Sequence, residues 1–196
     1  MASLLCGLWP WWAFQEASSR GLTDIVDQAT LLKKVPLSTD ACVAAAVLSS
    51  FLLQHVGFLL FLGAFAVLGR VPLEITWIWL PLVAAVGFLL ALGVALLTAP
   101  VYVVVRDTVH LVTAALTVGF FASPVLYEIR ELPESLRGVA ALNPVAGLLG
   151  LYRLVCLGAP WPEARSLVAL VLSILLLAWA SSRIERRLTP YLDEYL

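Results

Sequence analysis

The chain has 196 residues, of which 62% are hydrophobic, and its mean hydropathy is +0.98. Soluble domains contain about 45–50% apolar residues, so this composition excludes a soluble globular protein and indicates an integral membrane protein. The formal net charge of −1 provides no basic field, so we expect no nucleic-acid partner.

The first apolar segment runs over residues 4–21. The chain is apolar from its start and lacks a basic n-region, which argues against a secretory signal peptide. Glu16 and Arg20 stand four residues apart, so the two side chains can pair along one helix face. The pair either supports the helix or forms a polar contact near the inner mouth of a pathway.

Four further segments are apolar enough to cross a bilayer, whose hydrocarbon core of about 30 Å needs about 20 helical residues. Residues 75–105 are uncharged, too many for one upright helix and too few for two. Pro100 removes a backbone donor, so we end that span near Ala99. The sequence predicts an all-α membrane protein of one domain, residues 1–196, with about five transmembrane helices. The four further spans are 41–69, 75–99, 108–127 and 164–182.

These spans place residues 21–40, 106–107 and 183–196 on one face of the membrane, and residues 70–74 and 128–163 on the other. Lys and Arg favour the cytoplasmic side, and a basic cluster directly follows the last span. We therefore expect a cytoplasmic C-terminal tail, 183–196, and an N-terminus outside. The first face holds seven basic residues and the second holds five: Arg20, Lys33, Lys34, Arg106, Arg183, Arg186 and Arg187, against Arg70, Arg130, Arg137, Arg153 and Arg165.

Arg106 and Asp107 stand side by side between two predicted spans. At a turn, headgroups and water solvate such charges, which cost far less there than in the middle of the bilayer. The sequence therefore predicts a solvated cytoplasmic turn.

Residues 128–162 form neither a span nor a simple loop. Pro133 followed by Glu134 suits a first helical turn, and Asn143 followed by Pro144 gives an N-cap and a first helical position. We expect two short helices before the last span. They form either a re-entrant hairpin in the outer leaflet, which needs protein or water around its backbone, or a pair of interfacial amphipathic helices.

Residues 24–40, within a predicted cytoplasmic loop of residues 22–40, are a candidate contact with another protein. The stretch has an acidic start, then apolar residues, two lysines and a stop at Pro36. This order predicts a short helix that projects from the membrane boundary. The alternative is a basic loop that lies on anionic lipid.

Aromatic side chains stack well on sugar rings. Four of them either line a route for glycans or belong to the aromatic belt of the membrane: Trp11, Trp12, Phe14 and Tyr127.

The sequence lacks the P-loop, zinc-protease and serine-hydrolase motifs, so we expect no catalytic residue and no cofactor. Cys6, Cys42 and Cys156 form no metal-ligand or redox motif, so we expect no metal site and no disulfide. His55 lies inside a predicted span, where it either bonds to a neighbouring helix or relays protons.

Four motifs resemble, in order and spacing, the permease subunit of ABC exporters of polysaccharides, the type that exports O-antigen, capsule or teichoic acid. The resemblance covers nearly the whole chain. The motifs are LWPWWAFQEASSRG at 8–21, ATLLKKV at 29–35, VVVRDTVHLV at 103–112 and FFASPVLYEIRELPESLRGVAALNPV at 120–145.

The resemblance implies three functional regions. It makes Arg106 and Asp107 brace the cytoplasmic end of the bundle, at the turn before the family's fifth helix. It assigns docking on a separate ATPase subunit to Leu31, Leu32, Lys33, Lys34 and Val35. It assigns the extracytoplasmic gate helices to the segment that contains Ser123, Pro124, Pro133, Asn143 and Pro144.

Two departures from the family pattern stand out. Members usually have six spans and carry an amphipathic helix and one more span before the PW motif, so the chain looks N-terminally truncated. An aromatic pair, Pro and Arg usually follow the two lysines, whereas here the next residues after Val35 are Pro36, Leu37, Ser38 and Thr39.

The resemblance implies that two copies of the permease form a pathway, that two ATPase subunits bind ATP and drive it, and that a lipid-linked glycan passes outward across the bacterial plasma (inner) membrane. The alternatives are an exporter of a drug or small lipid, and a membrane scaffold or assembly factor with no transport role.

Overall fold

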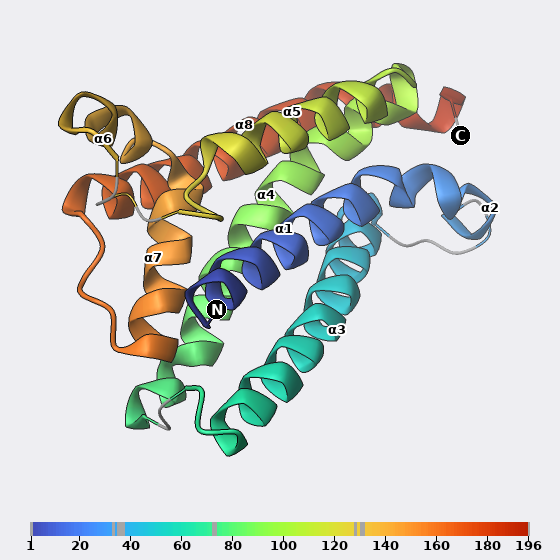
Figure 1. Cartoon of the computed structure of the whole chain (residues 1–196). Helices are drawn as coiled ribbons and strands as arrows, with labels where there is room; N and C mark the ends of the chain where they lie inside the picture. Colours follow the sequence, from blue (N-terminus) through green and yellow to red (C-terminus); the bar gives the residue numbers. More distant parts are fainter. Residues whose placement is uncertain are drawn as a thin grey trace.

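The computed structural model describes residues 2–32, 34, 38–71, 74–127, 129 and 132–195, and over these residues the protein is all-α (Figure 1). The elements are α1 (Ala2–Asp27), α2 (Ala29–Leu32), α3 (Thr39–Val67), η1 (Ile75–Trp79), α4 (Leu80–Val104), α5 (Thr108–Ala122), α6 (Glu134–Ala140), α7 (Pro144–Leu157) and α8 (Ala164–Tyr195).

Three segments of the described chain are long and apolar enough to cross a membrane: Thr39–Val67, Ile75–Val104 and Ala164–Arg187. They confirm three of the five predicted spans, and the protein is a multi-pass membrane protein. α1 has 26 residues but carries charged residues in its second half, and it does not belong to this group. α5 has 15 residues, about 22 Å of helix, which is shorter than a span.

Two predicted helix ends are wrong. α4 does not stop near Ala99 but continues through Pro100 to Val104. A proline removes only one backbone donor, and membrane helices tolerate this where neighbouring helices surround the site; Pro100 is buried. The predicted span 108–127 is also too long, because Ser123 is extended and precedes Pro124, which disfavours helix at that position.

The long uncharged stretch 75–105 has a simple solution in the structure. Its first residues form the 3₁₀ helix η1, and α4 follows without a break. Before it, α3 ends at Val67, and Gly69, two residues further on, has a left-handed φ of +67°. The Arg70 N–H donates to the Phe65 carbonyl at 2.8 Å and the Gly69 N–H to the Ala66 carbonyl at 2.9 Å, which is the Schellman arrangement that closes a helix.

α4 is the central helix, and it contacts α1, α3, α5, α7 and α8. Its crossing with α1 is close because the residues there are small. Ala91 and Ala95 are fully buried, and a Cβ on Gly21 would lie 2.6 Å from the Cβ of Ala95. Small residues at such a crossing let two backbones approach, which is how helices pack without a hydrophobic driving force between them.

The connections gather at two ends of the bundle (Figure 1). We call one the α2 end; it holds α2, the α4–α5 connection and the end of α8. We call the other the α7 end; it holds the α3–α4 connection, η1, α6 and the start of α8. This grouping agrees with the partition of connecting segments predicted from the sequence. The described part of the predicted C-terminal tail is helical, because α8 runs to Tyr195.

Candidate functional site

The predicted docking residues lie at the α2 end. α2 is a single turn in which the N–H groups of Leu31 and Leu32 donate to the Gln28 carbonyl at 2.9 and 3.0 Å. The Leu31 side chain is 43% exposed, whereas Leu32 packs against the core. Lys34 is also exposed. Two of the five predicted docking residues lie outside the described residues: Lys33 and Val35.

We predicted that the acidic residue Asp24 begins the projecting helix, and this prediction is wrong. Asp24 belongs to the last turn of α1, and the helix is interrupted at Gln28 before α2 begins. The Asp24 side chain is 7% exposed, and its Oδ1 accepts a hydrogen bond from Gln28 Nε2 at 2.5 Å. Burial raises the pKa of this carboxyl, and the bond from Gln28 opposes that change.

The predicted turn at Arg106 and Asp107 is confirmed in its conformation. Both residues are exposed between α4 and α5. The Asp107 carbonyl accepts from the His110 N–H at 3.0 Å and so begins α5. The Arg106 guanidinium lies 5.4 Å from the centre of the Tyr102 ring, a cation–π contact at the surface. That the two residues brace the cytoplasmic end of the bundle stays a prediction.

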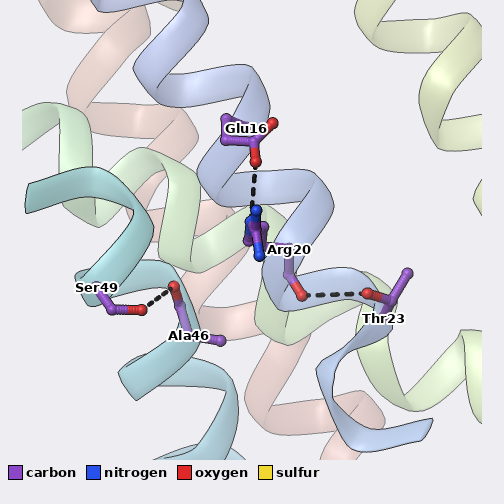
Figure 2. Close-up of polar contacts among 5 residues, drawn as sticks. All are labelled: Glu16, Arg20, Thr23, Ala46 and Ser49. Carbon is purple, nitrogen blue, oxygen red and sulfur yellow. Dashed lines mark hydrogen bonds and ion pairs between the residues drawn. The ribbon is translucent and has the colours of Figure 1, made fainter. Parts of the chain in front are cut away.

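Glu16 and Arg20 pair along α1 as predicted. The Arg20 Nε donates to Glu16 Oε1 at 2.8 Å, and the two side chains are 43% and 67% exposed for Glu16 and Arg20 respectively. Figure 2 shows the pair on α1, with Ala46 and Ser49 on the neighbouring turns of α3. This pairing was predicted from the spacing of the two residues, and the structure adds that α3 lies beside the pair.

The four candidate aromatic residues take different positions. Trp11 and Phe14 are buried; the Trp11 ring contacts Phe120 of α5, and its Nε1 donates to Gln15 Oε1 at 2.9 Å. Trp12 is exposed. Tyr127 is partly exposed, and its hydroxyl lies 3.5 Å from the Ala122 carbonyl. Of the three candidates on α1, Trp12 is therefore the residue whose ring is exposed for contact with another molecule.

Asn143 joins the predicted gate helix to the end of α5. Its Oδ1 accepts from the Val145 N–H at 2.9 Å, so it is the N-cap of α7, and Pro144 occupies the first turn as predicted. Its Nδ2 donates to Ser123 Oγ at 2.9 Å and to the Ala122 carbonyl at 3.2 Å. Pro133 precedes the first residue of α6. Three predicted gate residues thus meet at one place: Ser123, Asn143 and Pro144.

Arg153 joins α7 to the turn after α5, a contact that the sequence analysis did not predict. It is 7% exposed, and its Nη2 donates to the Pro124 carbonyl at 2.7 Å and to the Val125 carbonyl at 3.2 Å. Gly7 of α1 lies against the same place, since a Cβ there would be 2.9 Å from Arg153 Nη2. A single arginine in an apolar helix was the signal that could have found it.

Tyr152 and His55 connect α7 to α3. The Tyr152 hydroxyl and His55 Nε2 lie 2.6 Å apart, and His55 Nδ1 lies 2.8 Å from the Phe51 carbonyl. Because a carbonyl oxygen only accepts, Nδ1 carries the proton and Nε2 accepts from Tyr152. Of the two roles considered for His55, the bond to a neighbouring helix is confirmed.

α7 is surrounded by protein on much of its length. It contacts α1, α4 and α8, and a Cβ on Gly147 would lie 2.5 Å from the Ser166 carbonyl. This packing supplies the protein environment that a re-entrant helix needs. How deeply α6 and α7 enter a membrane stays a prediction.

Metal ligands do not cluster in the described part of the chain: it contains no group of three or more His, Cys, Asp or Glu residues placed to hold an ion. Cys6, Cys42 and Cys156 are buried free thiols.

The fold and these two ends define a class: an all-α membrane protein with an exposed single-turn helix at one end and polar-anchored short helices at the other. Residues 1–157 match the family described as ABC-2 type transporter. The chain belongs to this family.

Curated relatives are O-antigen export permeases. The chain is 31% identical over 186 residues to the O-antigen export system permease protein RfbA of Myxococcus xanthus, covering 92% of this chain and 70% of that protein. It is 24% and 23% identical over 155 residues to two RfbA permeases of Klebsiella pneumoniae, covering 76% of this chain. The chain spans 58% of the length of each Klebsiella relative.

Proposed function

We propose that the chain is the permease subunit of an ABC exporter that moves a lipid-linked polysaccharide of the O-antigen type outward across the bacterial plasma membrane. One observation carries the proposal: the 31% identity to an O-antigen export permease extends over 92% of the chain. A separate subunit binds and hydrolyses ATP, and two copies of the permease enclose the pathway.

The geometry supports a mechanical connection between the two ends. α1 is one continuous helix of 26 residues, about 39 Å long. It contacts α7 near Gly7 and is followed at its other end by α2. A displacement of α2 by an ATPase would therefore act on α7 through a single rigid element, with the α2 end in the cytoplasm and the α7 end outside.

The polar anchors of α7 suit a gate that holds one position until it is displaced. Asn143 and Arg153 bond to residues 122–125 at the end of α5, and Tyr152 bonds to His55 of α3. Hydrogen bonds between membrane helices contribute about 0.6 to 1.7 kcal/mol each, so a few of them hold the helix without locking it.

The test is transport by the complete complex. The permease and its ATPase are co-expressed, purified together and reconstituted in vesicles loaded with labelled lipid-linked glycan. We expect glycan transfer that requires ATP and stops with a non-hydrolysable analogue. ATP-driven movement of a drug or small lipid with no glycan transfer would replace the cargo, and failure of any ATPase to co-purify would favour a scaffold.

A further inference from the structure

A polar cleft of about 580 Å³ lies between α1 and α3 toward the α2 end. Six of its lining residues come from α1, between Glu16 and Asp27, and recur at spacings of three and four, so they occupy one helix face; Gln28, directly after α1, lines it as well. Three small residues of α3 line the other side: Ala45, Ala46 and Ser49. Figure 2 shows part of the cleft, with Glu16, Arg20 and Thr23 on α1 beside Ala46 and Ser49.

The cleft contains a carboxylate whose hydrogen bonding is incomplete. Asp24 lines it with a side chain that is 93% buried by the 7% exposure given above, and Oδ2 has no partner in the described residues while Oδ1 accepts from Gln28. A buried polar atom without a partner costs about 1–3 kcal/mol, and more when the group is charged. Oδ2 is itself covered, so a donor in the cleft reaches it only when the Asp24 side chain turns toward the cleft; the new bond would then remove this cost.

The lining favours a cation over a sugar or a metal. Glu16 and Arg20 neutralise each other, which leaves the negative charges of Asp24 and Asp27. Among the described residues, no aromatic ring lines the cleft, so this lining lacks the stacking surface typical of sugar recognition. The described residues also include no cluster of metal ligands. A guanidinium or ammonium group neutralises the charge of the two carboxylates and can donate a hydrogen bond to Asp24 Oδ2.

The position of the cleft favours a partner that also contacts α2. Gln28 is shared: its side chain donates to Asp24, and its carbonyl accepts the N–H groups of Leu31 and Leu32. A cation that binds Asp24 would therefore fix the base of α2. Asp27, the last residue of α1, is exposed at the same place.

We propose that this cleft receives a basic side chain, Lys or Arg, of the ATPase subunit, with Asp24 and Asp27 as its acceptors. The inference rests on the proposed function and adds to it a second contact beside α2. The contact orients the docked ATPase, since an ion pair of this kind fixes register between two proteins.

The first experiment measures ATPase affinity for the full permease in lipid nanodiscs at low and high salt. We expect Asp24→Asn with Asp27→Asn to weaken binding about tenfold or more and to flatten its salt dependence, because screening acts on exposed ion pairs. Asp27→Glu keeps the charge and should bind like wild type. Glu163→Gln, which removes an exposed carboxylate at the α7 end, should also leave the affinity unchanged.

Wild-type affinity and salt dependence in the double Asn variant would overturn the inference. The outcomes separate it from the proposed function. If wild type binds the ATPase and Leu31→Asp weakens binding while the double Asn variant does not, only the cleft contact is wrong. If wild type binds no ATPase, the proposed function is wrong.

A photo-crosslinking residue identifies the occupant directly. Ala45 lines the cleft and is exposed, and Leu60 is exposed further along α3 and does not line it. We expect ATPase crosslinks from position 45 and none from position 60. Crosslinks from position 45 only to a second permease copy, to lipid or to glycan would overturn the proposal.

Discussion

Removal of the Tyr152 hydroxyl tests whether a hydrogen bond to His55 holds α7 against α3. Tyr152→Phe deletes the donor to His55 Nε2, which lies 2.6 Å away. The Tyr152 ring is fully buried and lies 5.8 Å from the Phe58 ring centre, and phenylalanine keeps that packing. The substitution therefore removes one hydrogen bond and leaves His55 Nε2 without its donor.

Two estimates bound the effect. Leaving a buried acceptor unpaired costs about 1–3 kcal/mol, whereas hydrogen bonds between membrane helices average about 0.6 kcal/mol and reach about 1.7. Because His55 is only partly buried, we expect a loss of about 1 kcal/mol. For a chain of this size, such a loss lowers the unfolding midpoint by about 2–4 °C.

Thermal unfolding of the purified protein in one detergent measures this change. Tyr102→Phe, at the surface of the α2 end beside Arg106, is the matched control and should shift the midpoint little. A double-mutant cycle with His55→Phe should give a coupling of about 1 kcal/mol, because the two side chains share one bond. Unchanged stability of Tyr152→Phe, or full additivity in the cycle, would refute the reasoning.

Three further predictions follow from the two ends. Asn143→Ala should destabilise the protein by about 1–2 kcal/mol in the same unfolding assay, because it removes the N-cap of α7 and the donors to Ser123 and Ala122; Asn143→Asp keeps the cap acceptor and should fall between. The pKa of the Asp24 carboxyl is raised by burial, so its ionisation lowers the stability of the folded protein as pH rises through the folded pKa. Asp24→Asn should therefore be more stable than wild type at pH 7, and the two proteins should be equally stable below pH 3.8, the ordinary pKa of the carboxyl. A stability difference in acid as large as that at pH 7 would contradict this prediction. Lys33→Glu with Lys34→Glu should abolish export and ATPase binding without changing the activity of the free ATPase, and intact export would refute docking at this segment.

The local signals of the sequence predicted much of the fold. Hydropathy located α3, α4 and α8. Residue pairs a few positions apart gave the Glu16–Arg20 ion pair and the cap at Asn143, because helix geometry alone brings such residues together.

The sequence did not predict contacts between distant segments. The Tyr152–His55 bond joins residues 97 positions apart, and no local pattern encodes that separation. The same limit explains Arg153, whose acceptors belong to the turn after α5. The prediction that α4 ends before Pro100 was wrong for a related reason, since the packing around α4 decides whether a proline ends the helix. Asp24 looked like a helix start because the break at Gln28 carries no strong terminator in the sequence.

The orientation of the two ends is the claim on which the account depends. Single cysteines at Thr30, exposed on α2, and at Leu142, exposed between α6 and α7, are introduced after the three native cysteines are replaced by serine. A membrane-impermeant maleimide then labels intact cells and permeabilised cells. The account predicts that Leu142→Cys reacts in intact cells and that Thr30→Cys reacts only after permeabilisation; labelling of Thr30→Cys in intact cells would contradict it.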